Sequence, residues 1–163
     1  MKAGGRSRFR GTGETPWTLL LACLVAVLAS CGSYPRDAGG TRERIVSSRL
    51  IRVGVVDGPT TPARQALIAA YLERLRGATG ALPRIVTGAA EPLLIQLEAD
   101  QLDLVVGEVA RDSPWISEVT VIEPLAERRL QGRWVGLSPM ARNGENAWIM
   151  LLEREAREMR AGS

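Results

Sequence analysis

The sequence predicts an α/β domain with a mostly parallel sheet, and two observations carry this prediction. From residue 50 onward, short apolar runs rich in β-branched residues alternate with longer stretches of helical periodicity. The run over 102–109 is almost continuously apolar, as expected of a strand that is covered on both faces. Two successive right-handed βαβ crossovers place the first strand between the other two. We therefore expect a small three-layer domain whose sheet has the core order 2-1-3.

The first strand and helix have clear boundaries in the sequence. LIRVGVV at 50–56 reads as a buried strand that a following Asp-Gly-Pro turn ends. Thr61 is expected to cap the next helix, with Pro62 at its first position. Gly77 or Gly80 is expected to end it. One face of this helix collects the apolar residues Ile68, Tyr71, Leu72 and Leu75.

The remaining elements follow from the same two periodicities. Trp148 belongs to the apolar face of the last helix, and both Trp134 and Trp148 are expected to act as core or surface anchors. We expect strands over 84–88, 102–109, 118–125 and 133–141, and helices over 91–101 and from about residue 144 to residue 160.

Residues 1–30 have the layout of a secretory signal. Four basic residues precede an apolar run over 17–29, which is shorter than the ~20 residues of a membrane-spanning helix. The run ends in Leu-Ala-Ser followed by Cys31, which resembles the lipobox of bacterial lipoproteins. Cleavage before Cys31 would make this cysteine the lipid-bearing residue. An ordinary secreted protein with an incidental Cys31 is the alternative.

Cleavage would also remove the excess of positive charge. The full chain has a net charge of +3, but residues 1–30 hold four basic residues and one acidic residue. Residues 31–163 then carry 17 basic and 17 acidic side chains. A neutral balance with no basic block gives no support to nucleic-acid binding. The polar stretch 31–48, rich in Gly, Ser and Arg, is expected to be a flexible tether, and 49–163 a single domain.

Three segments carry a resemblance to a known family. LIRVGVV with its proline-containing loop, LLIQLEADQLDLVVGEV at 93–109, and WVGLSPMARNGENAWIMLLEREAREM at 134–159 resemble parts of one lobe of the family 3 extracellular solute-binding proteins, the periplasmic binding proteins of amino-acid-type ABC transporters. The resemblance spans about residues 50–160. It implies a non-catalytic domain whose ligand is a small polar solute. It also implies a membrane permease as the protein partner.

The chain departs from this family in informative ways. Family members have two lobes around the ligand, whereas about 110 residues have room for one. The arginine that grips the ligand carboxylate in the family would fall at Trp115 here, and the nearest arginine is Arg111. Asp100 stands where the family has a glycine, and it can still adopt a left-handed conformation. Trp115 lies in a polar loop, where its indole could contact either a ligand or a partner protein.

The geometry of parallel sheets places a candidate ligand site. Ligands bind beyond the carboxyl ends of the strands, near the point where the strand order reverses. Arg111 would grip an anionic group there, while Asp57 or Glu108 would pair with an ammonium. A purely structural role explains the same residues: Thr61 caps a helix, Asp57 forms a turn, and Arg111 pairs with Glu108 or Asp112. The candidate ligand-binding residues are Asp57, Thr60, Thr61, Glu108, Arg111 and Ser113.

The composition argues against an enzyme. The chain has no histidine, and its only cysteines are Cys23 and Cys31, which removes His-dependent nucleophile systems and the usual zinc sites. No glycine-rich phosphate loop is present, so we expect no metal and no cofactor.

Two functional hypotheses remain. In the first, the protein is a lipid-anchored solute-binding component of an ABC-type transport system. In the second, it is a non-catalytic envelope lipoprotein that uses the lobe as a scaffold for a protein partner. Both place it in the cell envelope of a bacterium, and Gly32 after the lipidated cysteine resembles lipoproteins that are sorted to the outer membrane.

Overall fold

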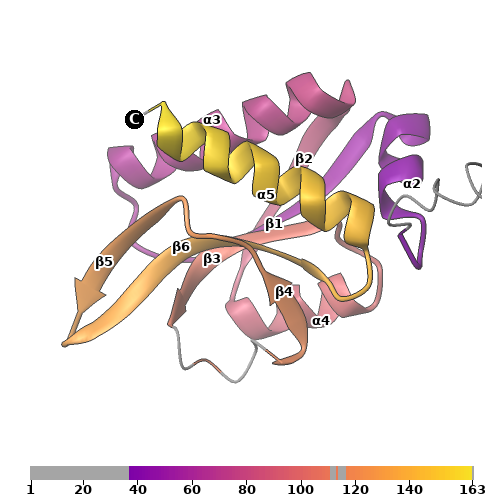
Figure 1. Cartoon of the computed structure of the whole chain (residues 1–163). Coiled ribbons are helices and arrows are strands. Elements are labelled where there is room, and N and C mark those ends of the chain that lie inside the picture. The colour runs from indigo at the N-terminus through magenta and orange to yellow at the C-terminus, as the bar shows by residue number, and fades with distance from the viewer. Residues whose placement is uncertain (1–36, 111–112, 114–116, 163) are drawn as a thin grey trace, which may run out of the picture. The chain divides into compact units, whose positions relative to one another are not determined.

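The protein folds around a mixed six-stranded sheet with helices on both faces (Figure 1). The computed structural model describes residues 37–110, 113 and 117–162. Its strand order is β2-β1-β3-β6-β4, and β5 pairs with β6 as well. Helices α3 (Pro62–Thr79) and α5 (Asn146–Ala161) cover one face of the sheet, and α4 (Ala90–Glu98) covers the other. The predicted three-layer α/β architecture is confirmed.

The parallel 2-1-3 core has the predicted order. Strand β1 (Leu50–Val56) pairs in parallel with β2 (Leu82–Gly88) on one side and with β3 (Leu104–Ala110) on the other. Strand β1 has its predicted bounds, whereas β2 begins two residues before the predicted range. Most of β2 is exposed because it is an edge strand, and its proline is compatible with that place.

The second half of the sheet is antiparallel, so the sheet is mixed and not mostly parallel as predicted: three of the five strand pairings are antiparallel. Strand β6 (Arg133–Arg142) pairs with β3 on one side. Its other side is shared by β4 (Val119–Val121) and β5 (Ala126–Leu130). Pro139 lies on β6 between the part that pairs with β4 and the part that pairs with β5, so neither pairing requires a backbone N–H from it. Its carbonyl accepts from the Ile122 N–H at 2.9 Å.

This part of the sheet corrects one strand prediction and adds one strand. The expected strand over 118–125 pairs regularly only over 119–121, because the chain then leaves the ladder to pass Pro124 over Gly136. Strand β5 was not predicted, since AERRL has no apolar alternation and its strand conformation comes from pairing with β6.

The two faces of the sheet bury separate cores. Four α3 residues pack with β1 and α5 on one face, and they are the residues predicted from the helical periodicity: Ile68, Tyr71, Leu72 and Leu75. On the other face, α4 packs its leucines against Val105 and Met140. Gly80 ends α3 in the left-handed conformation, as one of the two predicted stops. Helix α4 ends three residues before its predicted end, and Asp100 has the expected left-handed φ of 58°.

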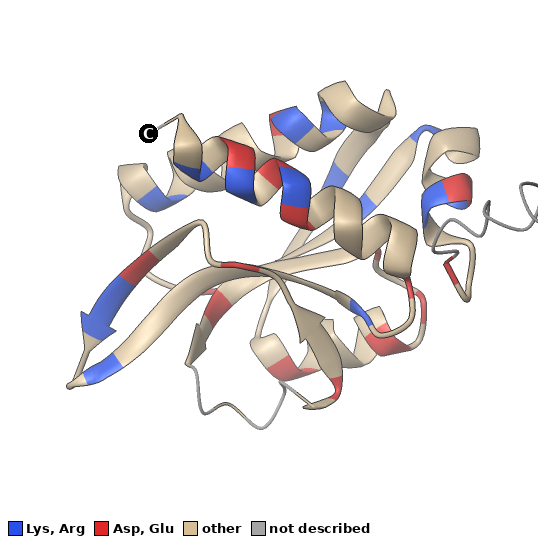
Figure 2. Cartoon of the chain, viewed as in Figure 1, with Lys and Arg blue, Asp and Glu red and all other residues tan. Residues whose placement is uncertain are grey.

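Helices α3 and α5 are joined by polar contacts as well. The Tyr71 hydroxyl donates to the Leu152 carbonyl at 3.0 Å, and burial raises the pKa of Tyr71. Arg74 pairs with Glu155 at 2.9 Å and also with Glu158. Basic and acidic residues are interspersed along α5, whereas α3 carries three arginines and one glutamate (Figure 2).

The two tryptophans differ in environment. Trp148 is fully buried, and its indole Nε1–H donates to the Asp103 carbonyl at 2.7 Å. Trp134 is 47% exposed, and the Arg129 guanidinium lies 5.5 Å from its ring centroid. Trp148 is therefore a core anchor and Trp134 a surface residue.

The prediction of a flexible tether up to residue 48 is wrong for residues 37–48. Helix α2 (Thr41–Ser48) packs against the domain, with Ile45 fully buried. The Glu145 carboxylate accepts the backbone N–H of Gly39 at 2.7 Å and that of Thr41 at 3.0 Å. Asp37 accepts from the Trp148 N–H at 2.9 Å. The anchors lie about a hundred residues away, so local composition gave no sign of them.

An ion-pair network around the buried Asp103 links α2 to the sheet. The Asp103 carboxylate is fully buried and accepts from Arg44 and Arg52, each at 2.6 Å. Asp100 also pairs with both arginines, at 2.7 Å and 3.2 Å. These contacts raise the pKa of Arg52, chiefly through its hydrogen bond to Asp103. The network fixes the end of the sheet opposite the carboxyl ends of β1 and β3.

None of the helices in the described ranges combines the length and the apolar character that crossing a membrane requires. The predicted signal sequence and Cys31 lie outside the described residues.

Candidate functional site

The carboxyl ends of β1 and β3 meet the start of α3, where the sequence placed the site. After β1, the Asp57 N–H donates to the Gly88 carbonyl at 2.8 Å, which holds the loop against the end of β2. The Thr61 hydroxyl accepts from the Arg64 N–H at 3.3 Å and caps α3. Thr61 thus has the structural role that the sequence offered as an alternative.

Arg64, in the first turn of α3, is the central cation of this region. Its Nη2 donates to the Val56 carbonyl at 2.6 Å, so the guanidinium is fixed over the end of β1. Its Nε is buried and has no hydrogen-bond partner among the described residues. A buried donor without an acceptor costs roughly 1–3 kcal/mol.

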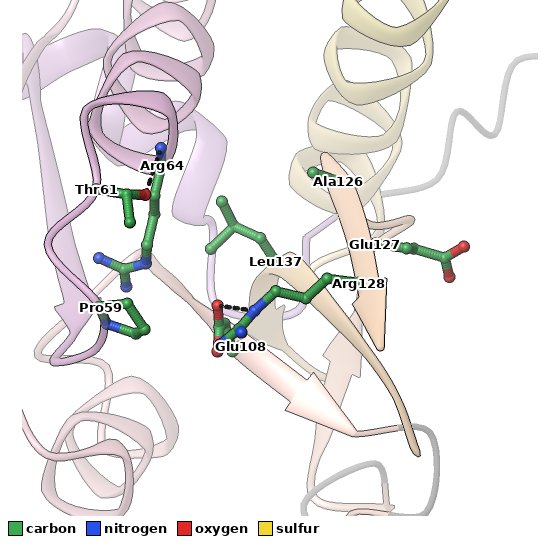
Figure 3. A pocket seen from close by; sticks show the side chains of 8 residues that line it. All are labelled: Pro59, Thr61, Arg64, Glu108, Ala126, Glu127, Arg128 and Leu137. Atoms are coloured by element: carbon green, nitrogen blue, oxygen red, sulfur yellow. Dashed lines mark hydrogen bonds and ion pairs between the residues drawn. The ribbon is translucent and has the colours of Figure 1, made fainter. Parts of the chain in front are cut away.

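A hollow of about 170 Å³ lies between this arginine and strand β5 (Figure 3). The Arg64 guanidinium is on one wall, and Glu108 and Arg128 form the opposite wall. Leu137 lies between them and provides an apolar floor. The hollow is lined by Pro59, Thr61, Arg64, Glu108, Ala126, Glu127, Arg128 and Leu137.

Glu108 and Arg128 form a bidentate ion pair across strand β6. Arg128 Nε donates to Glu108 Oε1 at 3.0 Å, and Nη2 donates to Oε2 at 2.8 Å. The hydrogen bond to Glu108 raises the pKa of Arg128. The sequence analysis expected Arg111 as a possible partner of Glu108, and the structure shows Arg128 in this place.

A second hollow, of about 380 Å³, lies between α3 and β2. Asp57, Thr60 and Thr87 contribute polar groups, and Ile68 and Ile85 are among its apolar residues. Arg64 lines this hollow too, so its side chain separates the two spaces.

The candidate residues therefore do not converge on one space. Thr61 and Glu108 line the smaller hollow, whereas Asp57 and Thr60 line the larger one. Ser113 is half-buried, lines neither of these two hollows, and donates its backbone N–H to the Ala110 carbonyl at 3.0 Å. Arg111 lies outside the described residues, as does Trp115.

Sequence reasoning missed Arg64 and Arg128. Arg64 offered one sign: a cation in the first turn of a helix opposes the helix dipole, and no acidic residue accompanies it there. Arg128 offered no sign, because its strand was not predicted.

The described part of the chain contains no group of three or more His, Cys, Asp or Glu side chains that could hold a metal ion. The charged groups that line the smaller hollow are guanidinium and carboxylate groups.

No protein-family model and no curated protein matches the sequence. Solved structures match the fold. The arginine-bound form of domain 1 from TmArgBP is similar with a TM-score of 0.58 and 17% identity, over 71% of this chain and 97% of that chain. An amino acid ABC transporter substrate-binding protein from Streptococcus pneumoniae, bound to L-arginine, has a TM-score of 0.58 and 7% identity, over 75% of this chain and 92% of that chain.

An ancestral cyclohexadienyl dehydratase is similar to the same extent, with a TM-score of 0.60 and 9% identity, over 74% of this chain and 91% of that chain. Binding proteins and an enzyme thus share this fold, and these low identities establish the fold alone. The domain has the architecture of a single lobe of a periplasmic binding protein.

Proposed function

We propose that the domain binds a small polar, amino-acid-like solute without catalysis, as a lipid-anchored component of an ABC-type transport system. The observation that carries the proposal is Arg64. Its guanidinium lines a hollow whose other wall holds a carboxylate and a second guanidinium, and its buried Nε has no partner among the described residues. A ligand carboxylate in the hollow would accept hydrogen bonds from the side of the guanidinium that lines it.

The place of the hollow also supports binding. It lies beyond the carboxyl ends of β1 and β3, at the point where the strand order reverses. A lone lobe leaves the ligand partly solvated. The arginine-bound domain 1 from TmArgBP is a precedent for ligand binding by one domain of such a protein.

The anchor and the location remain part of the proposal. Residues 1–30 would serve as the signal, Cys31 would carry the lipid, and residues 31–36 would join it to the folded domain. The partner would then be a membrane permease in the cell envelope, with no nucleic acid involved.

The test is a thermal-melt screen of the full-length protein in detergent with amino acids, polyamines, small carboxylates and sugars. A ligand at a hundred times its dissociation constant adds about 2.7 kcal/mol of stability and raises the melting temperature by several degrees. We expect a carboxylate-bearing solute to give this rise, and Arg64→Ala to remove it. Arg76→Ala, on an exposed turn of the same helix, is the matched control.

Two results would contradict the proposal. A cooperative melt with no shift for any solute would favour the scaffold role instead. A shift that survives Arg64→Ala but is lost in Arg111→Ala would move the site to the residue that the sequence favoured.

A further inference from the structure

Arg128 reaches its partner because of the register of three strands. Glu108 on β3 is opposite Leu137 on β6, and Leu137 is opposite Ala126 on β5. Side chains of residues in such a row lie on the same face of a sheet, as do residues two positions apart on one strand. Arg128 therefore lies on the face of Glu108 and extends across β6 to it (Figure 3).

This contact uses both oxygens of the Glu108 carboxylate, one for Nε and one for Nη2 of Arg128. A planar guanidinium that donates two parallel bonds matches the geometry of a carboxylate, which a single point charge does not. Glu127 also belongs to the lining, but its carboxylate points away from the other charged groups (Figure 3). The charged groups that face one another are thus two cations and one anion.

We infer that Arg128 occupies, on Glu108, the position that a cationic group of a ligand would take, and thereby excludes cationic solutes from the hollow. This inference rests on the proposed function and names its substrate class. A cation from solution would have to displace a guanidinium that the same chain holds at high effective concentration. An anionic group meets Arg64, whose guanidinium lines the hollow.

The ligands that fit are small carboxylates. An amino acid with a neutral or acidic side chain fits only with its ammonium group outside the hollow, because Arg128 already occupies Glu108. Arginine, lysine and polyamines do not fit, because their cationic ends would face Arg128 and Arg64 without a free carboxylate. The ligand charge of this protein would then differ from that of the arginine-bound structures that share its fold.

Replacing Arg128 tests this directly. The probes are succinate, which is an anion only, and agmatine, which carries a guanidinium and no carboxylate. We measure their dissociation constants by calorimetry for the full-length protein in detergent and for Arg128→Gln. The matched control is Arg129→Gln, since Arg129 is the next residue of β5 and lies against Trp134 instead.

We expect the unaltered protein and Arg129→Gln to bind succinate and to give no response to agmatine. Arg128→Gln is expected to bind agmatine at least tenfold more tightly than the unaltered protein, and Arg128→Gln combined with Glu108→Gln should lose that gain. Glu108→Gln alone frees Arg128 and should tighten succinate binding, which gives a second readout that does not need the Arg128 variant.

The outcomes separate the two proposals. Equal agmatine binding in the unaltered protein and a folded Arg128→Gln would overturn the masking role of Arg128, while succinate binding would leave the proposed function standing. The absence of any carboxylate response in the unaltered protein would overturn the proposed function, while a gain of agmatine binding in Arg128→Gln would still support the masking of Glu108.

Discussion

Glu145 is a single residue that holds the start of the folded domain. Its carboxylate is 1% exposed and accepts from two backbone N–H groups and from Arg142 at 2.7 Å. Burial acts to raise the pKa of Glu145, but the hydrogen bonds from Thr41, Gly39 and Arg142 outweigh it, so that the pKa lies below its usual 4.5. The charged carboxylate is therefore part of what stabilises the native state.

The sign of the pH effect follows from this lowered pKa. Below about pH 4.5 the unfolded chain takes up a proton at Glu145 before the native state does, so acid favours unfolding. We expect Glu145→Gln to lower the free energy of unfolding at pH 7 by about 2 kcal/mol and to flatten its decline toward pH 3. Urea melts of the chain from Gly32 at a series of pH values measure both.

Glu43→Gln is the matched control, because Glu43 is an exposed carboxyl of α2. Equal stability of Glu145→Gln and Glu43→Gln across the pH range would show that the carboxylate does not hold α2.

At the same residue scale, the candidate site stays a prediction, and the sequence named only some of the residues that line the smaller hollow. Thr61 and Glu108 are two of them, because strand and helix ends can be read locally. Arg128 could not be found, since its contact with Glu108 requires the order of β3, β6 and β5 and their register. Long-range register is a property of the sheet and leaves no mark on the pentapeptide AERRL.

Among the elements, β1 and β3 approach closely at Gly107. A Cβ on this residue would lie 2.5 Å from Val56 Cγ2 and 2.8 Å from Val56 Cβ, which is closer than packed carbons allow. We expect Gly107→Ala to destabilise the domain by about 1–3 kcal/mol through overpacking. Denaturant unfolding of the chain from Gly32 checks this value. An unchanged denaturation midpoint for Gly107→Ala would mean that β1 and β3 can move apart without loss of stability.

Gly77→Ala is the contrasting variant, because apart from the adjacent backbone of α3 itself no atom lies within 4 Å of the Cβ that it would add. A helix-interior alanine in open space should stabilise by about 0.5–1 kcal/mol. If Gly107→Ala lowers the free energy of unfolding and Gly77→Ala raises it, the space around the added Cβ decides the effect, and the loss of a glycine as such does not.

Elements with local determinants were predicted well. Strand β1 has a continuous β-branched run, and α3 has a threonine cap, a proline at its first position and a glycine stop. Elements that depend on distant partners were missed or misjudged: β5 needs β6, and α2 needs Glu145 and Asp103. The sequence of α2 has one buried apolar side chain, Ile45, which is too few for a periodic pattern.

At the scale of the whole molecule, α2 belongs to the domain and not to a tether. Removing residues 32–48 would expose the core around Ile45 and leave Asp103 without Arg44. We expect this deletion to cost at least about 2 kcal/mol, since burial of one isoleucine alone contributes 1.5–3 kcal/mol. Urea unfolding compared with removal of 32–36 alone measures it. Identical urea midpoints for the two deletions would show that residues 37–48 do not stabilise the domain and act as a flexible tether.

The way α2 is anchored also sets an order in time. It is the first element of the domain to leave the ribosome or to pass through an export channel, yet its partner Glu145 follows 104 residues later. At about 5–20 residues per second, the helix waits roughly 5–20 seconds for its docking site to be synthesised. Its attachment therefore marks the completion of the chain, and a chain broken off before α5 would display α2 as an unattached end.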